Sequence, residues 1–192
     1  MKYRKSQDPG KRTMSPILAF PLSQIPTQME RMVIDMEDFR FYNHIGIDLP
    51  ATILAIKYDI AVGKPVIGAS TISQQLARTL FLNPQKNIFR KYFEALLSLE
   101  LELTLSKRRI LELYFNTIEW GPGIFGIGRA AESYFHKKPA ELDQDEQARL
   151  VAIIASPLLH SPTDFESDLF LRDRYYFIKL TSKARELFKA AW

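Results

Sequence analysis

The stretch RKYFEALLSLELEL, residues 90–103, decides whether the chain is purely helical or mixed. Its second half, residues 97–103, alternates apolar and polar side chains, which fits a strand with one buried face. Its first half lacks that alternation, and no turn-forming residue separates Phe89 from Leu103. Because strands are short and helices long, the uninterrupted length predicts one helix over about residues 87–104.

Helix start and stop signals lie on both sides of this segment. Residues 27–38 have apolar side chains at helical spacing, and the pattern ends near Glu37. Asp48 followed by Pro50 is typical of a helix N-terminus, and Gly63 can end that helix. The other signals are the capping boxes Thr71 with Gln74 and Asp143 with Glu146, a start at Ser106, a stop at Pro157 and Pro162, and a last helix over 172–191. We therefore predict an all-α fold in one compact domain.

Composition limits the kind of protein. The chain has 192 residues, 46% of them apolar, which is enough for one domain with a sizeable core. It has no cysteine, which excludes disulfides and thiolate metal sites, and its three histidines are too scattered to indicate a metal cluster. The formal charge of +4 lies wholly in the first twelve residues. We expect residues 1–14 to be a flexible basic tail, and we expect no nucleic-acid partner.

Two of the expected helices carry polar faces. Thr71, Gln75 and Arg78 share one side of their helix, and Arg90 and Glu94 are four positions apart in the next. Together the faces can line a cleft for an anionic ligand, although Arg90 with Glu94 also fits an ordinary surface pair. The glycine-rich residues 120–128 fit either a phosphate cradle or a loop.

Five stretches follow one another in a fixed order: EDFRFYNHIG (37–46), GASTISQQLAR (68–78), RKYFEALLSLELE (90–102), SKRRILELYFN (106–116) and GPGIFGIGRAAESYFHKK (121–138). They resemble the successive motifs of the peptidoglycan glycosyltransferase family, glycosyltransferase family 51. This family supplies the transglycosylase domain of bifunctional penicillin-binding proteins and the monofunctional transglycosylases, and IEWGPGIFG (118–126) is similar to the monofunctional branch. The resemblance covers roughly residues 27–162, and five ordered motifs make a chance match very unlikely.

The resemblance implies a lysozyme-like, all-α domain over residues 15–192, with a head and a smaller membrane-proximal jaw at roughly 47–67. It also implies polymerisation of lipid II into β-1,4-linked glycan strands, with release of undecaprenyl diphosphate. The implied partners are lipid II, the growing glycan, the membrane surface and cell-wall synthesis proteins. The implied location is the outer face of the cytoplasmic membrane, in the bacterial cell envelope. No cofactor is obligatory, and a Mg or Mn ion is allowed at the diphosphate.

The resemblance also assigns residues. It implies two catalytic residues: Glu37, which matches the catalytic glutamate of the family, and Glu94, which matches its second glutamate. Positions near the lipid-linked substrates are matched by Thr71, Gln75, Arg78, Lys86 and Arg90. Asp38, His44 and Lys91 are expected to support these groups rather than to react.

The reaction itself calls for such side chains. The donor sugar is α-linked and the product β-linked, so a single displacement inverts the anomeric carbon. That displacement needs a base on the acceptor 4-hydroxyl and positive charge on the departing diphosphate. Glu37 suits the first role, and Arg78, Lys86 and Arg90 suit the second.

Residues 49–62 lie between the first two motifs, where the jaw is expected. This segment is apolar enough to rest on lipid, with Leu49, Ile53, Ile56 and Ile60 as candidate contacts, although a buried helix would have the same composition.

The sequence departs from the family at three points. Arg78 stands where lysine is usual, Thr79 replaces Asn or Asp, and no stretch reaches the ~18 apolar residues of a membrane span. Two alternatives remain open, a lysozyme-type glycan hydrolase and a catalytically silent lipid II-binding scaffold. The first has little need of the cationic residues, and the second has no need of Glu37 and Glu94.

Overall fold

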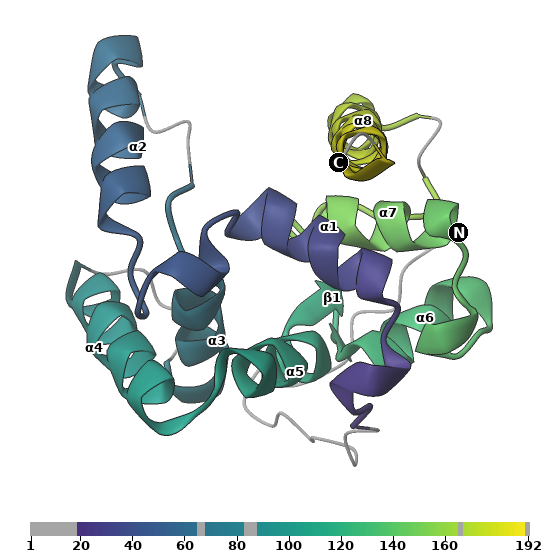
Figure 1. The fold of residues 1–192 in the computed structure, drawn as a ribbon, viewed down its shortest axis with the longest axis horizontal. Coiled ribbons are helices and arrows are strands. Elements are labelled where there is room, and N and C mark those ends of the chain that lie inside the picture. Colours follow the sequence, from purple (N-terminus) through teal and green to yellow (C-terminus); the bar gives the residue numbers. More distant parts are fainter. Residues whose placement is uncertain (1–18, 65–67, 83–87, 165–166, 191–192) are drawn as a thin grey trace, which may run out of the picture.

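The computed structural model describes residues 19–64, 68–82, 88–164 and 167–190. The described chain is mostly helical (Figure 1), and its α-helices are α1 Thr27–Glu37, α2 Leu49–Val62, α3 Ile72–Phe81, α4 Ile88–Thr104, α5 Lys107–Thr117, α6 Ile127–Phe135, α7 Gln144–Ile153 and α8 Leu169–Ala190. Its only strands are β1 Glu119–Gly121 and β2 Ile124–Phe125, which form an antiparallel hairpin. Three short 3-10 helices cover Leu22–Gln24, Phe41–Asn43 and Pro139–Glu141. The all-α prediction is confirmed, and the fold agrees with the lysozyme-like domain that the resemblance implies.

Helix α4 settles the ambiguous stretch, because residues 97–103 are helical throughout. Of the α4 residues whose burial is described, Glu94, Ser98 and Leu101 are buried, at spacings of four and three. That spacing places them on one face, which packs against α3 and α5. The alternation of Leu with Glu is therefore a helical pattern in which only one leucine in two points inward.

The predicted helix ends are mostly confirmed. Asp48 caps α2 by accepting a hydrogen bond from the Ala51 backbone N–H at 3.0 Å, and Gly63 ends the helix in the left-handed conformation with φ 74°. The capping boxes of α3 and α7 are both present. Helix α7 ends at Ile153, before the two prolines that were expected to stop it.

Helix α8 begins three residues earlier than predicted, at Leu169 instead of Arg172. The Asp168 carboxylate accepts a hydrogen bond from the Leu171 N–H at 3.2 Å, which is the role of an N-cap. Asp168 also pairs with His160, and the His160 ring stacks on Phe170 with centroids 4.7 Å apart. The sequence signal was Asp168, the acidic residue directly before the apolar run, which the prediction overlooked.

One core joins the helices other than α2. Helices α1, α3, α4, α5, α6, α7 and α8 bury apolar side chains in it, and among the described residues Trp120 and Tyr114 are the largest fully buried side chains. Phe41 is fully buried, as expected, and lies under the ammonium of Lys107 at 4.4 Å from the ring centroid. Of the described α2 residues, only Ala55 is buried.

Helix α2 stands apart from the other helices, at the upper left of Figure 1. The four predicted contact residues Leu49, Ile53, Ile56 and Ile60 are 62%, 52%, 53% and 75% exposed, and Leu54, Tyr58 and Val62 are exposed as well. The alternative of a buried helix is therefore wrong for α2. Among the described helices, none combines the length and hydropathy needed to cross a bilayer.

The glycine-rich residues 120–128 form the hairpin and the start of α6. Gly126 has φ 83°, and a Cβ there would lie 2.6 Å from the Asn116 carbonyl oxygen, so this position needs glycine. The Gly123 N–H donates to the Glu119 carboxylate and the Gly126 N–H to the Ile118 carbonyl. These glycines serve the packing of the hairpin, which favours the loop alternative over the phosphate cradle.

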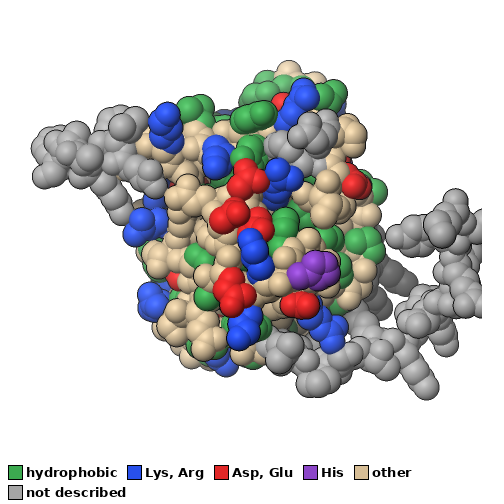
Figure 2. Space-filling view, turned by 90° about the vertical axis from the view of Figure 1, so that its right-hand side faces the viewer, with side chains coloured by type: hydrophobic (Ala, Val, Ile, Leu, Met, Phe, Trp, Pro, Cys, Tyr) green, Lys and Arg blue, Asp and Glu red, His purple; other side chains and the backbone are tan. Residues whose placement is uncertain are grey.

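Charges of both signs lie side by side on the face shown in Figure 2, instead of forming a field of one sign. Ion pairs such as Lys137 with Glu146, at 2.6 Å, join neighbouring elements. The predicted basic tail, residues 1–14, lies outside the described residues, as does Lys86.

Candidate functional site

Glu37 is the last residue of α1, and two donors from distant elements hold its carboxylate. Arg174 of α8 donates from Nη2 to Oε1 at 2.8 Å, and Gln75 of α3 donates from Nε2 to Oε2 at 3.1 Å. The Glu37 side chain is only 11% exposed. Each carboxylate oxygen keeps acceptor capacity beyond its one bond, so this fixed group can still accept a proton.

The orientation of Gln75 is itself fixed. The hydroxyl of Tyr114 in α5 donates to the Gln75 Oε1 at 2.9 Å, which leaves the amide nitrogen facing Glu37. Burial, and next the charge of Glu37, raises the pKa of Tyr114 well above its usual value, so this hydroxyl keeps its proton. A chain of hydrogen bonds thus runs from the Tyr114 hydroxyl in the core through the Gln75 amide to the Glu37 carboxylate.

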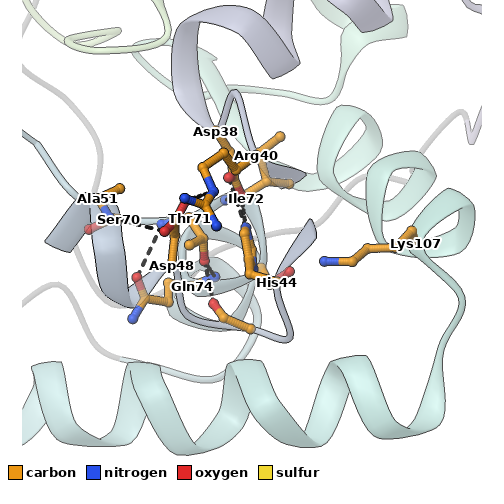
Figure 3. Close-up of polar contacts among 12 residues, drawn as sticks. Asp38, Arg40, His44, Asp48, Ala51, Ser70, Thr71, Ile72, Gln74 and Lys107 are labelled. Carbon is orange, nitrogen blue, oxygen red and sulfur yellow. Dashed lines mark hydrogen bonds and ion pairs between the residues drawn. The ribbon is translucent and has the colours of Figure 1, made fainter. Parts of the chain in front are cut away.

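Asp38 and His44 support the turn that follows Glu37 (Figure 3). The His44 Nε2 lies 2.8 Å and 3.0 Å from the two Asp38 oxygens, and the Ile72 backbone N–H donates to Asp38 Oδ2 at 3.0 Å. Both side chains are buried. This pair ties the end of α1 to the start of α3, in line with the supporting role expected for them.

Thr71 is 3% exposed, and its hydroxyl is committed to the backbone. It donates to the Gly46 carbonyl at 2.5 Å and accepts from the Gln74 N–H at 3.1 Å. The structure gives Thr71 the role of a helix cap that also holds the 37–46 motif. Contact between Thr71 and substrate stays a prediction.

Glu94 lies on α4 and is 1% exposed, so the interpretation of a surface pair is wrong for it. Lys91 Nζ lies 3.0 Å from Glu94 Oε2, and Arg90 Nε lies 3.3 Å from Oε1, within ion-pair distance but without hydrogen-bond alignment. Lys91 also donates to the Ser70 hydroxyl at 2.7 Å. A fully buried carboxylate is costly unless cations face it, and here two of them do.

Ser70 joins the two halves of the site. Its hydroxyl accepts from Lys91, and its carbonyl oxygen lies 3.5 Å from the same Gln75 nitrogen that faces Glu37. The predicted glutamates Glu37 and Glu94 therefore belong to one connected set of polar contacts. Arg78 is half-buried on α3, and its side chain makes no hydrogen bond or ion pair with another described residue. Its positive charge opposes the rise in the pKa of Tyr114.

A cavity of about 180 Å³ opens beside Glu37. Its walls come from the end of α1, the turn after it, the start of α2 and the segment before α3, and they include Asp35, Glu37, Phe39, Arg40, Asp48 and Ser70. The cavity is walled by carboxylates on its α1 side and by small residues at 68–70.

One group of side chains has metal-ligand character. Single donor atoms of Asp38, His44 and Asp48 lie within 4.8 Å of one another. His44 already points its Nε2 at Asp38, and Arg40 Nε lies 3.4 Å from Asp48 Oδ2. A cation bound there would have to break the hydrogen bond between His44 and Asp38 and separate Arg40 from Asp48.

Sequence analysis missed Tyr114, Ser70 and Arg174, and of these Arg174 is the one that contacts Glu37 directly. It lies 137 positions from Glu37, and its Nε also donates to the Ala152 carbonyl at 2.9 Å. The available signal was its place in α8, three residues after buried Leu171 and four before buried Ile178. That spacing puts Arg174 on the inner edge of the helix, where a charged side chain needs a partner.

The site thus has one glutamate buried among cations and a second held beside a cavity, an arrangement that permits proton transfer to or from a group bound there. The profile of the transglycosylase family matches residues 11–181, and the chain belongs to this family. The resemblance drawn from the five motifs is confirmed.

Several bacterial relatives bear the name biosynthetic peptidoglycan transglycosylase. The one from Nitrosomonas eutropha is 48% identical over 134 residues, which are 70% of this chain and 55% of that protein. The one from Thiobacillus denitrificans is 42% identical over 137 residues, 71% of this chain and 59% of that protein. The one from Alcanivorax borkumensis is 43% identical over 145 residues, 74% and 59% respectively. The chain thus spans between 55% and 59% of the length of these relatives.

Proposed function

We propose that the chain is a peptidoglycan glycosyltransferase that polymerises lipid II into β-1,4-linked glycan strands and releases undecaprenyl diphosphate. The observation that carries this proposal is Glu37, a carboxylate held by Arg174 and Gln75 at the wall of a cavity. The family membership and the names of the relatives support it.

In this mechanism Glu37 accepts the proton of the acceptor 4-hydroxyl. The acceptor oxygen forms a bond to the donor anomeric carbon from the face opposite the diphosphate, and the diphosphate leaves with the electron pair of the old bond. The configuration at that carbon inverts as a result. A general base of this kind contributes ~10²–10⁴-fold to the rate. Two fixed donors keep the carboxylate in place without a rearrangement at the moment of reaction.

The departing diphosphate needs positive charge. We assign this role to Arg78, Lys86 and Arg90, with Lys91 and Glu94 holding Arg90 and the Ser70 segment in position. Arg78 has no charged partner among the described residues, so its charge is available to an anion. Two cations already balance Glu94. We therefore expect a Mg or Mn ion at the diphosphate to supplement the positive charge of the side chains and not to replace it.

We further propose that α2 rests on the outer face of the cytoplasmic membrane, where lipid II is presented. Seven of its large hydrophobic side chains are exposed, and transfer of one aliphatic side chain from water to lipid stabilises by ~1.5–3 kcal/mol. The envelope location and contact with other cell-wall synthesis proteins belong to the same proposal.

Product analysis with lipid II in detergent or vesicles tests this function. We expect long glycan strands from the natural chain and none from Glu37→Gln, because the amide keeps the shape but cannot take the proton. Arg172→Ala, an exposed residue of α8, serves as the matched control and should keep full activity. Cleavage of preformed glycan would identify the hydrolase instead, and binding of lipid II without any product would identify the scaffold. A Glu37→Gln variant with near-natural polymerisation would remove Glu37 from the role of base.

A further inference from the structure

Phe39 is an exposed aromatic side chain at the site. It lies two residues after Glu37, is 72% exposed, and lines the cavity beside Glu37 and Asp38. One exposed apolar residue is ordinary in a protein surface. Tyr42 and Ile45 nearby are exposed as well, and Phe39 differs from them because it lines the cavity.

Asp35 faces the same cavity from two residues before Glu37. Its side chain is 10% exposed, and its Oδ1 accepts a hydrogen bond from Arg185 of α8. Its second oxygen, Oδ2, makes no hydrogen bond with another described residue. Asp35 therefore offers a fixed acceptor to whatever enters the cavity.

An aromatic face and a carboxylate on one small cavity match the chemistry of a sugar ring. A pyranose has an apolar face of C–H bonds, which packs on an aromatic ring, and a rim of hydroxyl and amide N–H donors, which a carboxylate accepts. The cavity, with a volume of about 180 Å³, has room for one sugar ring.

We propose that Phe39 and Asp35 select the acceptor sugar: Phe39 stacks on the face of the ring whose 4-hydroxyl reaches Glu37, and Asp35 accepts a hydrogen bond from a donor on its rim. This inference rests on the proposed function and adds the residues that recognise the acceptor. Glu37, between the two in sequence, then meets the 4-hydroxyl of a ring that is held on both sides.

The substitution Phe39→Leu separates stacking on a sugar from contact with lipid. Leucine keeps an apolar side chain but lacks a flat face, whereas Phe39→Trp keeps the face. With lipid II as substrate, we expect Phe39→Leu to raise KM about 3- to 10-fold with little change in kcat, and Phe39→Trp to stay near the natural value. Phe177→Leu changes an aromatic residue of α8 that is 54% exposed and does not line the cavity, and it should leave KM unchanged.

The test of Asp35 uses its ion-pair partner Arg185 as the control. Asp35→Asn should raise KM, because the amide oxygen is a weaker acceptor than a carboxylate, whereas Arg185→Ala removes the ion pair and keeps the Asp35 acceptor. Equal effects of the two variants would show that only the ion pair matters and would overturn the role of Asp35.

The outcomes also separate this inference from the proposed function. If the natural chain makes no glycan, the proposed function fails. If it makes glycan and Phe39→Leu has the natural KM, only the role of Phe39 fails. If Phe39→Leu keeps both KM and binding to neutral vesicles while Phe39→Ala loses both, Phe39 contacts lipid and the inference is wrong.

Discussion

Removal of the Arg174 guanidinium should weaken both the fold and the activity, because this side chain joins three elements. Its Nη2 holds Glu37 at the end of α1, and its Nε holds the Ala152 carbonyl at the end of α7. Among the described residues, the substitution Arg174→Ala leaves Glu37 with Gln75 as its donor, and it removes the donor to the Ala152 carbonyl.

The magnitude follows from the burial of the pair. Breaking a fully buried ion pair costs ~3–5 kcal/mol, whereas exposed pairs contribute ~0–1 kcal/mol. The side chains of Arg174 and Glu37 are 20% and 11% exposed, so the pair lies nearer the buried limit. We expect Arg174→Ala to lower the free energy of unfolding by about 2–3 kcal/mol. A misplaced catalytic group can cost ~10²-fold, so kcat should fall by about that factor with a smaller change in KM.

Two measurements check this expectation. Urea unfolding gives the free energy of unfolding, and initial rates of glycan formation from lipid II give kcat and KM separately. Arg174→Lys should recover part of the stability, because an ammonium keeps the charge but cannot serve both acceptors as a planar guanidinium does. Arg172→Ala on the same helix is the matched control, because Arg172 is exposed.

A double-mutant cycle isolates the contact. Arg174→Ala and Glu37→Gln, singly and together, should show a coupling of at least about 1 kcal/mol in the free energy of unfolding. Additive effects, or a folded Arg174→Ala variant with the natural kcat, would refute the conclusion that Arg174 positions Glu37.

Three further predictions concern other parts of the site. Tyr114→Phe should lower the free energy of unfolding by about 1–3 kcal/mol and lower kcat, because the Gln75 oxygen loses its buried donor; an unchanged kcat would show that Gln75 keeps its orientation without it. Ile53→Asp with Ile56→Asp should abolish sedimentation with neutral vesicles while the fold stays intact by circular dichroism, and retained binding would contradict the lipid contact of α2. Arg78→Lys should keep most polymerisation and Arg78→Ala should lose it if the diphosphate needs only charge, whereas equal large losses would indicate bidentate recognition.

The sequence by itself determined the helices and most of their ends, because these depend on neighbours within four positions. The Asp48 cap, the left-handed Gly63 and the capping boxes all act over such short distances. The length of α4 was predictable for the same reason, since no local signal interrupts it. The pair of Arg90 and Glu94 was visible too, but its burial was not.

Tertiary structure alone decided which distant side chains meet. Arg174 reaches Glu37 because α8 packs across α1 and α7, and no pattern in the sequence fixes how two helices cross. Composition also left α2 undecided between a buried helix and an exposed one, since both are apolar. Helix α2 is exposed because it lies away from the core that the other helices share. Local physical chemistry thus sets the elements, and the packing of those elements sets the site.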